Sequence, residues 1–102
     1  GKLIVTGGND TTLRLWEVGT GSLIRTLSGH TGHIYTAAFS PDGGLIASTA
    51  LDETLRVWDT QTGAQLTLFR ADGPMLACAW HADGVRIVAS GARGVYWLRL
   101  VR

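Results

Sequence analysis

The sequence predicts an all-β fold built from a repeated unit of four strands, and three observations support that prediction. Fourteen glycines stand against two prolines, and Val, Thr, Ile and Trp recur in short runs, a composition typical of strands joined by tight turns. Apolar residues never keep a 3.6-residue spacing over the ten or so positions that a helix needs. The third observation is an internal repeat with a period of 42 residues. We therefore expect almost no helix.

The repeat is visible when the sequence is compared with itself. A shift of 42 places residues 3–21 on residues 45–63 with nine identities in nineteen positions. A weaker third copy follows, because residues 39–43 recur as residues 80–84 at an offset of 41. Trp97 follows Trp58 by only 39 residues, which predicts a shortened connection in the third copy. Repeats of this length indicate an array of similar structural units.

Each element of the complete copy has a local signal. Strands are expected at residues 34–39, 45–50, 54–58 and 64–69, where apolar and β-branched residues alternate between turn signals. Pro41 presets a turn backbone and Gly43 tolerates a positive φ in the turn after the first strand. By the same pattern residues 1–28 hold three strands and residues 71–102 hold three. The total expected is ten strands.

The segment from Gly29 to Asp59 resembles a unit of the WD-repeat (WD-40) β-propeller family. The motifs that carry the resemblance are Gly-His at residues 29–30, Ser-Pro-Asp-Gly at residues 40–43, and Thr-Leu-Arg-Val-Trp-Asp at residues 54–59. The resemblance implies a partial β-propeller of about two and a half four-stranded antiparallel blades. It divides the chain into a partial blade at residues 1–28, a complete blade at residues 29–70 and a degenerate last blade at residues 71–102.

Two expectations concern the parent protein. Gly1 falls inside a blade and the single Met is Met75, so the chain is interpreted as a fragment of a larger propeller. Residues 78–81 and 94–98 also resemble the closing blade of a bacterial signalling protein.

The family resemblance implies a hydrogen-bonded tetrad in the complete blade. Its members would be His30, Ser48, Asp52 and Trp58, with the indole N–H bonded to the serine, the serine to the histidine, and the histidine to the carboxylate. A buried indole N–H and a buried carboxylate both need such partners. The rival interpretation is a hydrolase that uses Ser48, His30 and Asp52 as a catalytic triad, and we expect the structural role.

The other two copies are expected to carry incomplete versions of this tetrad. Thr6, Asp10 and Trp16 would serve the first blade, whose histidine would precede the first residue. In the third copy Asp72 stands in place of the histidine, and no carboxylate follows Ser90. That set is expected to be broken.

Candidate partner-binding residues follow from the family, whose partners usually dock on the loops that lead into each first strand and on the turns between second and third strands. This criterion selects His33, Tyr35, Asn9, Leu51, Pro74 and Met75. Exposed Leu, Tyr and Met side chains are good docking groups.

Composition limits the remaining classes of function. Nine Lys and Arg against eight Asp and Glu give a net charge of +1, so no nucleic acid is expected as a partner. One cysteine excludes an internal disulfide, and we expect no metal, no cofactor and no membrane span. The sequence thus predicts a non-catalytic, cytoplasmic scaffold for protein or peptide partners. A self-assembling structural fragment, associating through its own blades, is the alternative.

Overall fold

The computed structural model describes residues 2–101, and that part of the chain consists of strands and turns without a helix. The strands, in chain order, are β1 (Leu3–Gly7), β2 (Leu13–Glu17), β3 (Leu23–Leu27), β4 (Ile34–Phe39), β5 (Leu45–Ala50), β6 (Thr54–Asp59), β7 (Gln65–Arg70), β8 (Met75–Trp80), β9 (Arg86–Gly91) and β10 (Gly94–Arg99). No helix of the described residues is long and apolar enough to cross a membrane.

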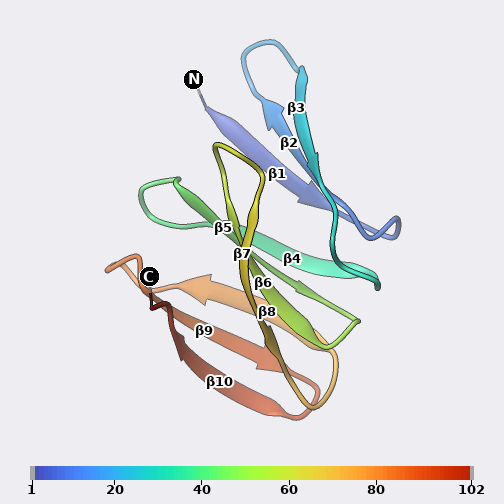
Figure 1. Cartoon of the computed structure of the whole chain (residues 1–102), viewed down its shortest axis with the longest axis vertical. Coiled ribbons are helices and arrows are strands. Elements are labelled where there is room, and N and C mark those ends of the chain that lie inside the picture. Colours follow the sequence, from blue (N-terminus) through green and yellow to red (C-terminus); the bar gives the residue numbers. More distant parts are fainter. Residues whose placement is uncertain (1, 102) are drawn as a thin grey trace.

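The ten strands form three antiparallel sheets that follow one another along the longest axis of the molecule (Figure 1). Sheet 1 has the order β1-β2-β3, sheet 2 the order β4-β5-β6-β7, and sheet 3 the order β10-β9-β8. All seven strand pairs among residues 2–101 are antiparallel. The predicted all-β class, the ten strands and the four-stranded middle unit are confirmed.

Strand boundaries agree with the sequence prediction most closely in sheet 2. The prediction for the first two strands of that sheet is correct to the residue, and the other two differ by one position. In sheet 3 the last strand runs from Gly94 to Arg99. It begins directly after a turn of only two residues.

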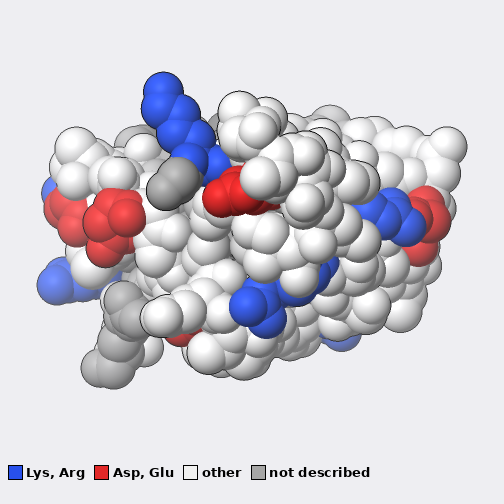
Figure 2. Space-filling model, turned by 90° about the horizontal axis from the view of Figure 1, so that it is seen from above, with Lys and Arg blue, Asp and Glu red and all other residues white. Residues whose placement is uncertain are grey.

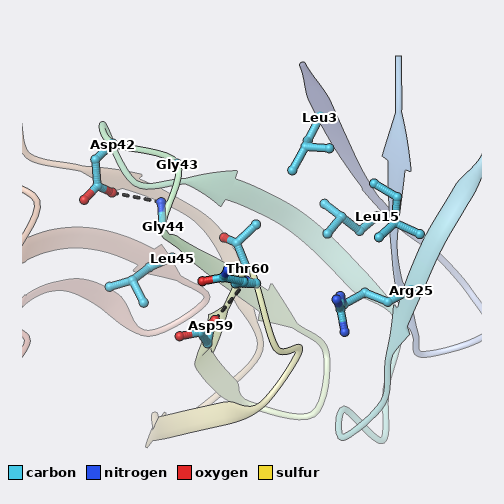
Figure 3. Close-up of a pocket in the computed structure, with 11 residues that line it drawn as sticks. Leu3, Leu15, Arg25, Asp42, Gly43, Gly44, Leu45, Asp59 and Thr60 are labelled. Carbon is cyan, nitrogen blue, oxygen red and sulfur yellow. Dashed lines mark hydrogen bonds between the residues drawn. The ribbon is translucent and has the colours of Figure 1, made fainter. Parts of the chain in front are cut away.

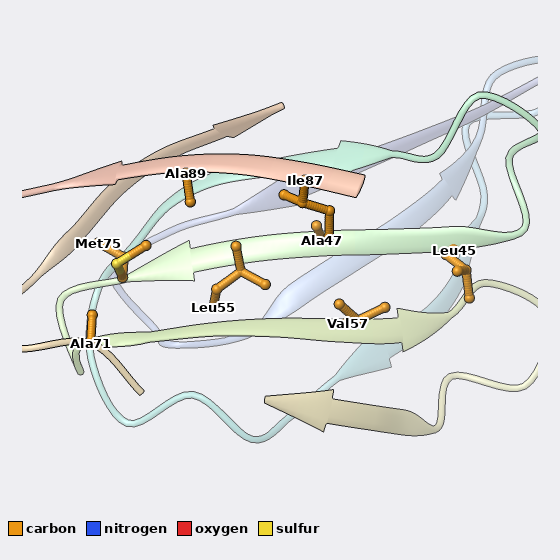
Figure 4. Close-up of a cluster of buried hydrophobic side chains, with 8 residues drawn as sticks. All are labelled: Leu45, Ala47, Leu55, Val57, Ala71, Met75, Ile87 and Ala89. Carbon is orange, nitrogen blue, oxygen red and sulfur yellow. The ribbon is translucent and has the colours of Figure 1, made fainter. Parts of the chain in front are cut away.

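Sheet 2 is covered on both faces, and all six residues of β5 are buried. One face packs on sheet 1 through a cluster that includes Ile46 and Trp58 together with Leu13 and Leu15. The other face packs on sheet 3 through Leu45, Ala47, Leu55, Val57, Ala71, Met75, Ile87 and Ala89 (Figure 4). Because successive strand residues face opposite sides, a strand buried on both sides has to be apolar or hydrogen-bonded throughout.

The turns lie at two ends of the sheets. One end, which we call the loop end, holds the β1–β2, β5–β6 and β9–β10 turns and the segments that lead into β4 and β8. We call the other end the hairpin end. At the hairpin end the β4–β5 and β8–β9 turns have the same backbone form, with Gly43 at φ 76° and Gly84 at φ 74°. Only glycine adopts such angles without strain, which accounts for the repeated Asp-Gly pair.

The third copy differs from the second in register. In sheet 2, Trp58 lies opposite Ile46. In sheet 3 the residue equivalent to Ile46 is Ile87, and the residue opposite Ile87 is Leu98 rather than Trp97. Trp97 is therefore out of the position expected for it, and it projects from the other face with 74% of its surface exposed. The β9–β10 turn is one residue shorter than the β5–β6 turn, and a slip of one residue exchanges the two faces of a strand.

The two outermost sheet faces have no covering sheet among the described residues. On sheet 1 that face carries Ile4, 49% exposed, and Trp16, whose indole N–H donates to Thr6 Oγ1 at 3.0 Å. On sheet 3 it carries Val95, 65% exposed, and Trp97. Both faces are apolar surfaces that would be buried against a further sheet.

The β9–β10 turn is expected to open more readily than the β5–β6 turn. In the longer turn the Asp52 carboxylate accepts from the backbone N–H of Thr54 at 3.0 Å, whereas Ala92 and Arg93 offer no carboxylate for that purpose. Side-chain bonds to turn amides raise the free energy of local opening. Amide hydrogen exchange should thus be faster at residues 92–94 than at residues 52–54. The reverse order of rates would contradict the prediction.

Candidate functional site

The four residues expected to form a tetrad lie together on the face of sheet 2 that packs against sheet 1. The indole N–H of Trp58 donates to Ser48 Oγ at 2.9 Å, and Ser48 Oγ lies 2.7 Å from His30 Nε2. His30 Nδ1 lies 2.9 Å from Asp52 Oδ2. With the proton on Nδ1, the histidine donates to the carboxylate and accepts the serine proton, so every polar atom of the chain of bonds has a partner.

Local sequence explains how these side chains meet. Ser48 lies in β5 and Trp58 in β6, and both face sheet 1. His30 comes from the segment that leads into β4, where Gly32 lets this segment approach the β5–β6 turn closely. A Cβ at Gly32 would lie 2.8 Å from the backbone nitrogen of Asp52, a distance that real Cβ contacts do not reach. Glycine is thus required at position 32 to bring the histidine to the carboxylate.

Two residues join the network that the sequence interpretation missed. Thr54 donates its hydroxyl to Asp52 Oδ1 at 2.6 Å, and Arg56 donates to the Thr54 hydroxyl at 3.1 Å. The Arg56 guanidinium also lies 3.5 Å from Asp52 Oδ2. The repeat contained a signal for these two residues, because the Asp-x-Thr-x-Arg spacing of residues 52–56 also occurs at residues 10–14.

Sheet 1 repeats part of this arrangement. Asp10 accepts from the Thr12 backbone N–H at 3.2 Å and from its hydroxyl at 3.0 Å, and it pairs with Arg14. The bond from Trp16 to Thr6 corresponds to the bond from Trp58 to Ser48. The Asp10 carboxylate is exposed, and its pKa is lowered by the Thr12 N–H and by Arg14.

Sheet 3 has no such network among the described residues. The register pairs Ala89 with Tyr96 where sheet 2 pairs Ser48 with Arg56, so alanine occupies the serine position. Ser90, which the sequence interpretation placed there, lies on the other face. Asp72 is exposed. The loss therefore includes the serine and the tryptophan as well as the histidine and the carboxylate.

The geometry does not suit the tetrad for catalysis, although its bonds have the order of a serine hydrolase triad. Ser48 is 0% exposed and His30 4% exposed, so a substrate carbonyl cannot approach the serine oxygen. That oxygen also accepts the indole N–H of Trp58, which lowers its availability as a nucleophile. The arrangement can hold the histidine segment, the β5–β6 turn and the β6 tryptophan in fixed positions.

Acid is expected to destabilise the chain through this network. Burial lowers the pKa of His30 below its ordinary 6.5 although Asp52 opposes the shift, so the unfolded chain takes up this proton at a higher pH than the folded chain. The associated stability is present above pH 6.5 and is lost as the pH falls through the folded pKa. Urea midpoints measured between about pH 7 and 5 should fall, and the fall should be smaller in His30→Asn. Parallel curves for the two proteins would contradict this origin.

The carboxylate of Asp52 adds a second loss at lower pH. Burial alone would raise its pKa, but bonds from the Thr54 side chain, the Thr31 N–H and His30 outweigh it and hold the pKa at about 2, against an ordinary 3.8. The stability from this group is present above pH 3.8 and is lost as the pH falls toward 2.

The residues expected to bind a partner all lie at the loop end, and all but one of them are at least partly exposed. Tyr35 is 45% and Leu51 47% exposed, and the His33 ring lies 5.0 Å from the Tyr35 ring. The Leu51 N–H donates to the His33 carbonyl at 2.8 Å. This bond holds the β5–β6 turn, which carries Leu51, against the segment that carries His33 and Tyr35. Asn9 is exposed and Pro74 half-buried.

Met75 is the exception, because it is 0% exposed and belongs to the core between sheets 2 and 3. A register shift between Met75 and Ala77 turns the next residue, Leu76, outward with 43% exposure. An equivalent shift between Ile34 and Thr36 exposes Tyr35. The structure thus replaces Met75 by Leu76, the residue one repeat after Tyr35. We call Tyr35, Leu51 and Leu76 the loop-end patch.

Charged residues are interspersed on the face seen in Figure 2, where Lys and Arg alternate with Asp and Glu. No group of three or more His, Cys, Asp or Glu that could hold a metal ion occurs among residues 2–101. The one cysteine, Cys78, is half-buried, and burial raises the pKa of its thiol.

Comparison with known proteins agrees with this geometry. The family model described as "WD domain, G-beta repeat" matches residues 1–17 and 21–59, which is more than half of the chain. The chain is 41% identical over 92 residues to the mouse F-box-like/WD repeat-containing protein TBL1X, covering 90% of the chain and 18% of that protein. It is 39% identical over 92 residues to human TBL1Y, with the same coverage of both chains.

A third relative is the nuclear distribution protein PAC1 of Arthroderma otae, 43% identical over 49 residues, or 48% of the chain and 11% of that protein. The chain spans less than a fifth of the length of these curated relatives.

Proposed function

The chain belongs to the WD-repeat family, and on that premise we propose that it is a non-catalytic interaction scaffold, part of a larger β-propeller, whose loop end docks a protein or peptide partner. One observation carries the proposal. The residues that could perform chemistry are buried in the sheet interior, whereas the loop-end patch exposes Tyr35, Leu51 and Leu76 on a framework that the tetrad holds rigid. Aromatic and leucine side chains on a rigid surface are typical binding anchors.

The loop-end patch can be tested with two leucines of equal exposure. Leu51 in the patch and Leu66 on the outer strand β7 are each 47% exposed. Peptides selected on the full chain from a random displayed library should bind Leu51→Ser at least about tenfold more weakly, and should bind Leu66→Ser as well as the original. Failure to select any peptide, or equal binding by Leu51→Ser, would contradict the proposal.

A second candidate function is association through the sheet faces, and the exposure of Trp97 and Val95 favours it. Repeat proteins bury their cores between neighbouring units, and this chain leaves an apolar face open at each end of its stack. Sedimentation velocity at micromolar concentration should show association that Trp97→Asp reduces. A monomer at every concentration would exclude this function for the isolated chain.

The remaining expectations stay predictions. Cytoplasmic location and the exclusion of nucleic acid and membranes rest on composition alone. The bacterial parent has no support from the relatives named above, which come from mouse, human and a fungus.

A further inference from the structure

A cleft of about 550 Å³ opens between sheets 1 and 2 at the hairpin end, away from the loop-end patch (Figure 3). Leu3, Leu15 and Ile24 line the side formed by sheet 1, and the β4–β5 and β6–β7 turns form the other side. Arg25 in β3 reaches toward the second wall, where Thr60 lies at the start of the β6–β7 turn (Figure 3).

Each wall of the cleft contributes a buried polar atom without a partner. Arg25 Nε and the Thr60 hydroxyl have no hydrogen-bond partner among residues 2–101. Thr60 is only 8% exposed, and buried polar side chains are satisfied in most native proteins. Arg25 is already held in place, because its Nη1 donates to the Thr62 carbonyl at 3.1 Å. The Nε–H of Arg25 from sheet 1 and the hydroxyl of Thr60 from sheet 2 therefore each lack a hydrogen-bond partner.

The next gap between sheets shows that the fold does not require these polar residues. The Thr60 N–H donates to the Gly44 carbonyl, and the Leu100 N–H makes the same bond to Val85. Leu100 therefore occupies, in the gap between sheets 2 and 3, the position that Thr60 occupies in the gap between sheets 1 and 2.

Strand register gives the same comparison for the arginine. Arg25 lies opposite Leu15 in sheet 1, and Thr67 lies opposite Val57 in sheet 2. The corresponding hollow, of about 220 Å³, is lined by Leu66, Thr67, Leu100 and Val101, where the first cleft has Ile24, Arg25, Thr60 and Gln61. The gap between sheets 2 and 3 therefore keeps the same sheet packing with mainly apolar residues at these positions. Sheet packing alone does not explain why Arg25 and Thr60 occupy them in the first cleft.

The charges around the cleft select against an anionic ligand. Asp42 and Asp59 both line it, and each holds its own turn, Asp42 by accepting from the Gly44 N–H at 2.9 Å and Asp59 from the Gln61 N–H at 2.8 Å. Two carboxylates beside one guanidinium would repel a carboxylate or phosphate. A neutral group that accepts from Arg25 and exchanges a bond with a hydroxyl suits the cleft better, and an amide does both.

We propose that this cleft binds a peptide segment by inserting an amide carbonyl between Arg25 and Thr60, with a neighbouring apolar side chain against Leu3 and Ile24. The proposal rests on the proposed function only in taking the partner to be a peptide. It assigns a second contact to the opposite end of the sheets from the loop-end patch.

The direct test follows the side-chain Nε–H signal of Arg25 by nuclear magnetic resonance in the full chain. The probe is N-acetyl-leucine N-methylamide, which carries amides and one apolar side chain. We expect a saturable shift with a Kd of about 1 mM, the range for a ligand of this size. N-acetyl-leucine with a free carboxylate should bind more weakly. Absence of saturation, or tighter binding of the free acid, would overturn the proposal.

Three variants fix the position of binding. Thr60→Leu copies the second gap and should weaken the probe at least about tenfold, and Thr60→Val removes only the hydroxyl and should weaken it by a smaller factor. Thr67→Leu makes a matched change in the second gap and should leave the titration unchanged. Dispersion of the amide spectrum reports whether each variant is folded. Equal affinity of folded Thr60→Leu and the original chain would overturn the proposal.

The outcome is separable from that of the proposed function. If Leu51→Ser abolishes docking while the amide titration fails, the loop-end patch stands and the cleft is excluded. If the titration succeeds while Leu51→Ser docks normally, the cleft stands and the loop-end patch is excluded.

Discussion

Replacement of Trp58 by alanine is expected to lower the free energy of unfolding by about 3 to 5 kcal/mol, the range for a fully buried aromatic side chain. The indole is 1% exposed, packs in the cluster between sheets 1 and 2, and donates to Ser48. The substitution leaves both a cavity and a buried hydroxyl with one partner fewer. Because whole domains are stable by only about 5 to 15 kcal/mol, this loss removes a large share of the stability of the chain. Urea unfolding followed by circular dichroism measures the difference.

Trp97→Ala is the matched control for this prediction. Its side chain is 74% exposed, and changes at such positions usually stay within about 0.5 kcal/mol. The comparison also tests the register of sheet 3, since the repeat alone equates the two tryptophans. A large loss of stability in Trp97→Ala at a concentration where the chain is monomeric would show that Trp97, rather than Leu98, occupies the core position.

Replacement of Asp52 by alanine is expected to cost about 3 kcal/mol, because it removes one partner of a buried charged network. The carboxylate accepts from His30, from the Thr31 N–H at 2.9 Å and from the N–H and hydroxyl of Thr54. Its side chain is 5% exposed. The donors left behind cannot reach water without moving the histidine segment away from the sheet.

Asp10→Ala is the control, since Asp10 makes the same bonds to Thr12 and Arg14 at an exposed site. We expect a much smaller loss than in Asp52→Ala, because water screens an exposed ion pair. A double-mutant cycle of Asp52→Ala with His30→Ala should give a coupling energy above about 1 kcal/mol. Additive effects would show that the two side chains do not act as one network.

The fold was predictable because its signals are local and repeated. Pro41 and the two Asp-Gly turns mark hairpin ends, and alternation along β6 separates Leu55 and Val57 from Arg56 without reference to any other strand. The tetrad was predictable from the family motif, but the roles of Thr54 and Arg56 depend on which strand faces which turn.

The errors in the third copy share one physical origin. A β-bulge after Met75 and a β9–β10 turn shortened by one residue each move a side chain to the opposite face. Identity matching alone cannot detect either change, so Trp97 was aligned with the buried Trp58 and Leu76 was overlooked. The cleft was also hidden from the sequence, because Arg25 and Thr60 are 35 positions apart and become unusual only when their counterparts in the next gap, Thr67 and Leu100, are known.

The arrangement of the two faces of each sheet gives the stack a polarity. Sheet 2 turns Trp58 toward sheet 1 and Val57 toward sheet 3, and sheet 1 likewise turns Trp16 away from sheet 2. Within the chain, the face of one sheet always packs on the opposite type of face of its neighbour. A two-fold dimer would bring two faces of the same type together, so it would not repeat the packing found twice within the chain. A further sheet that repeats this packing must therefore add head to tail, through a heterologous interface. Such growth ends only when the accumulated rotation returns the last sheet to the first, so closure is a property of the angle between neighbours rather than of any single contact.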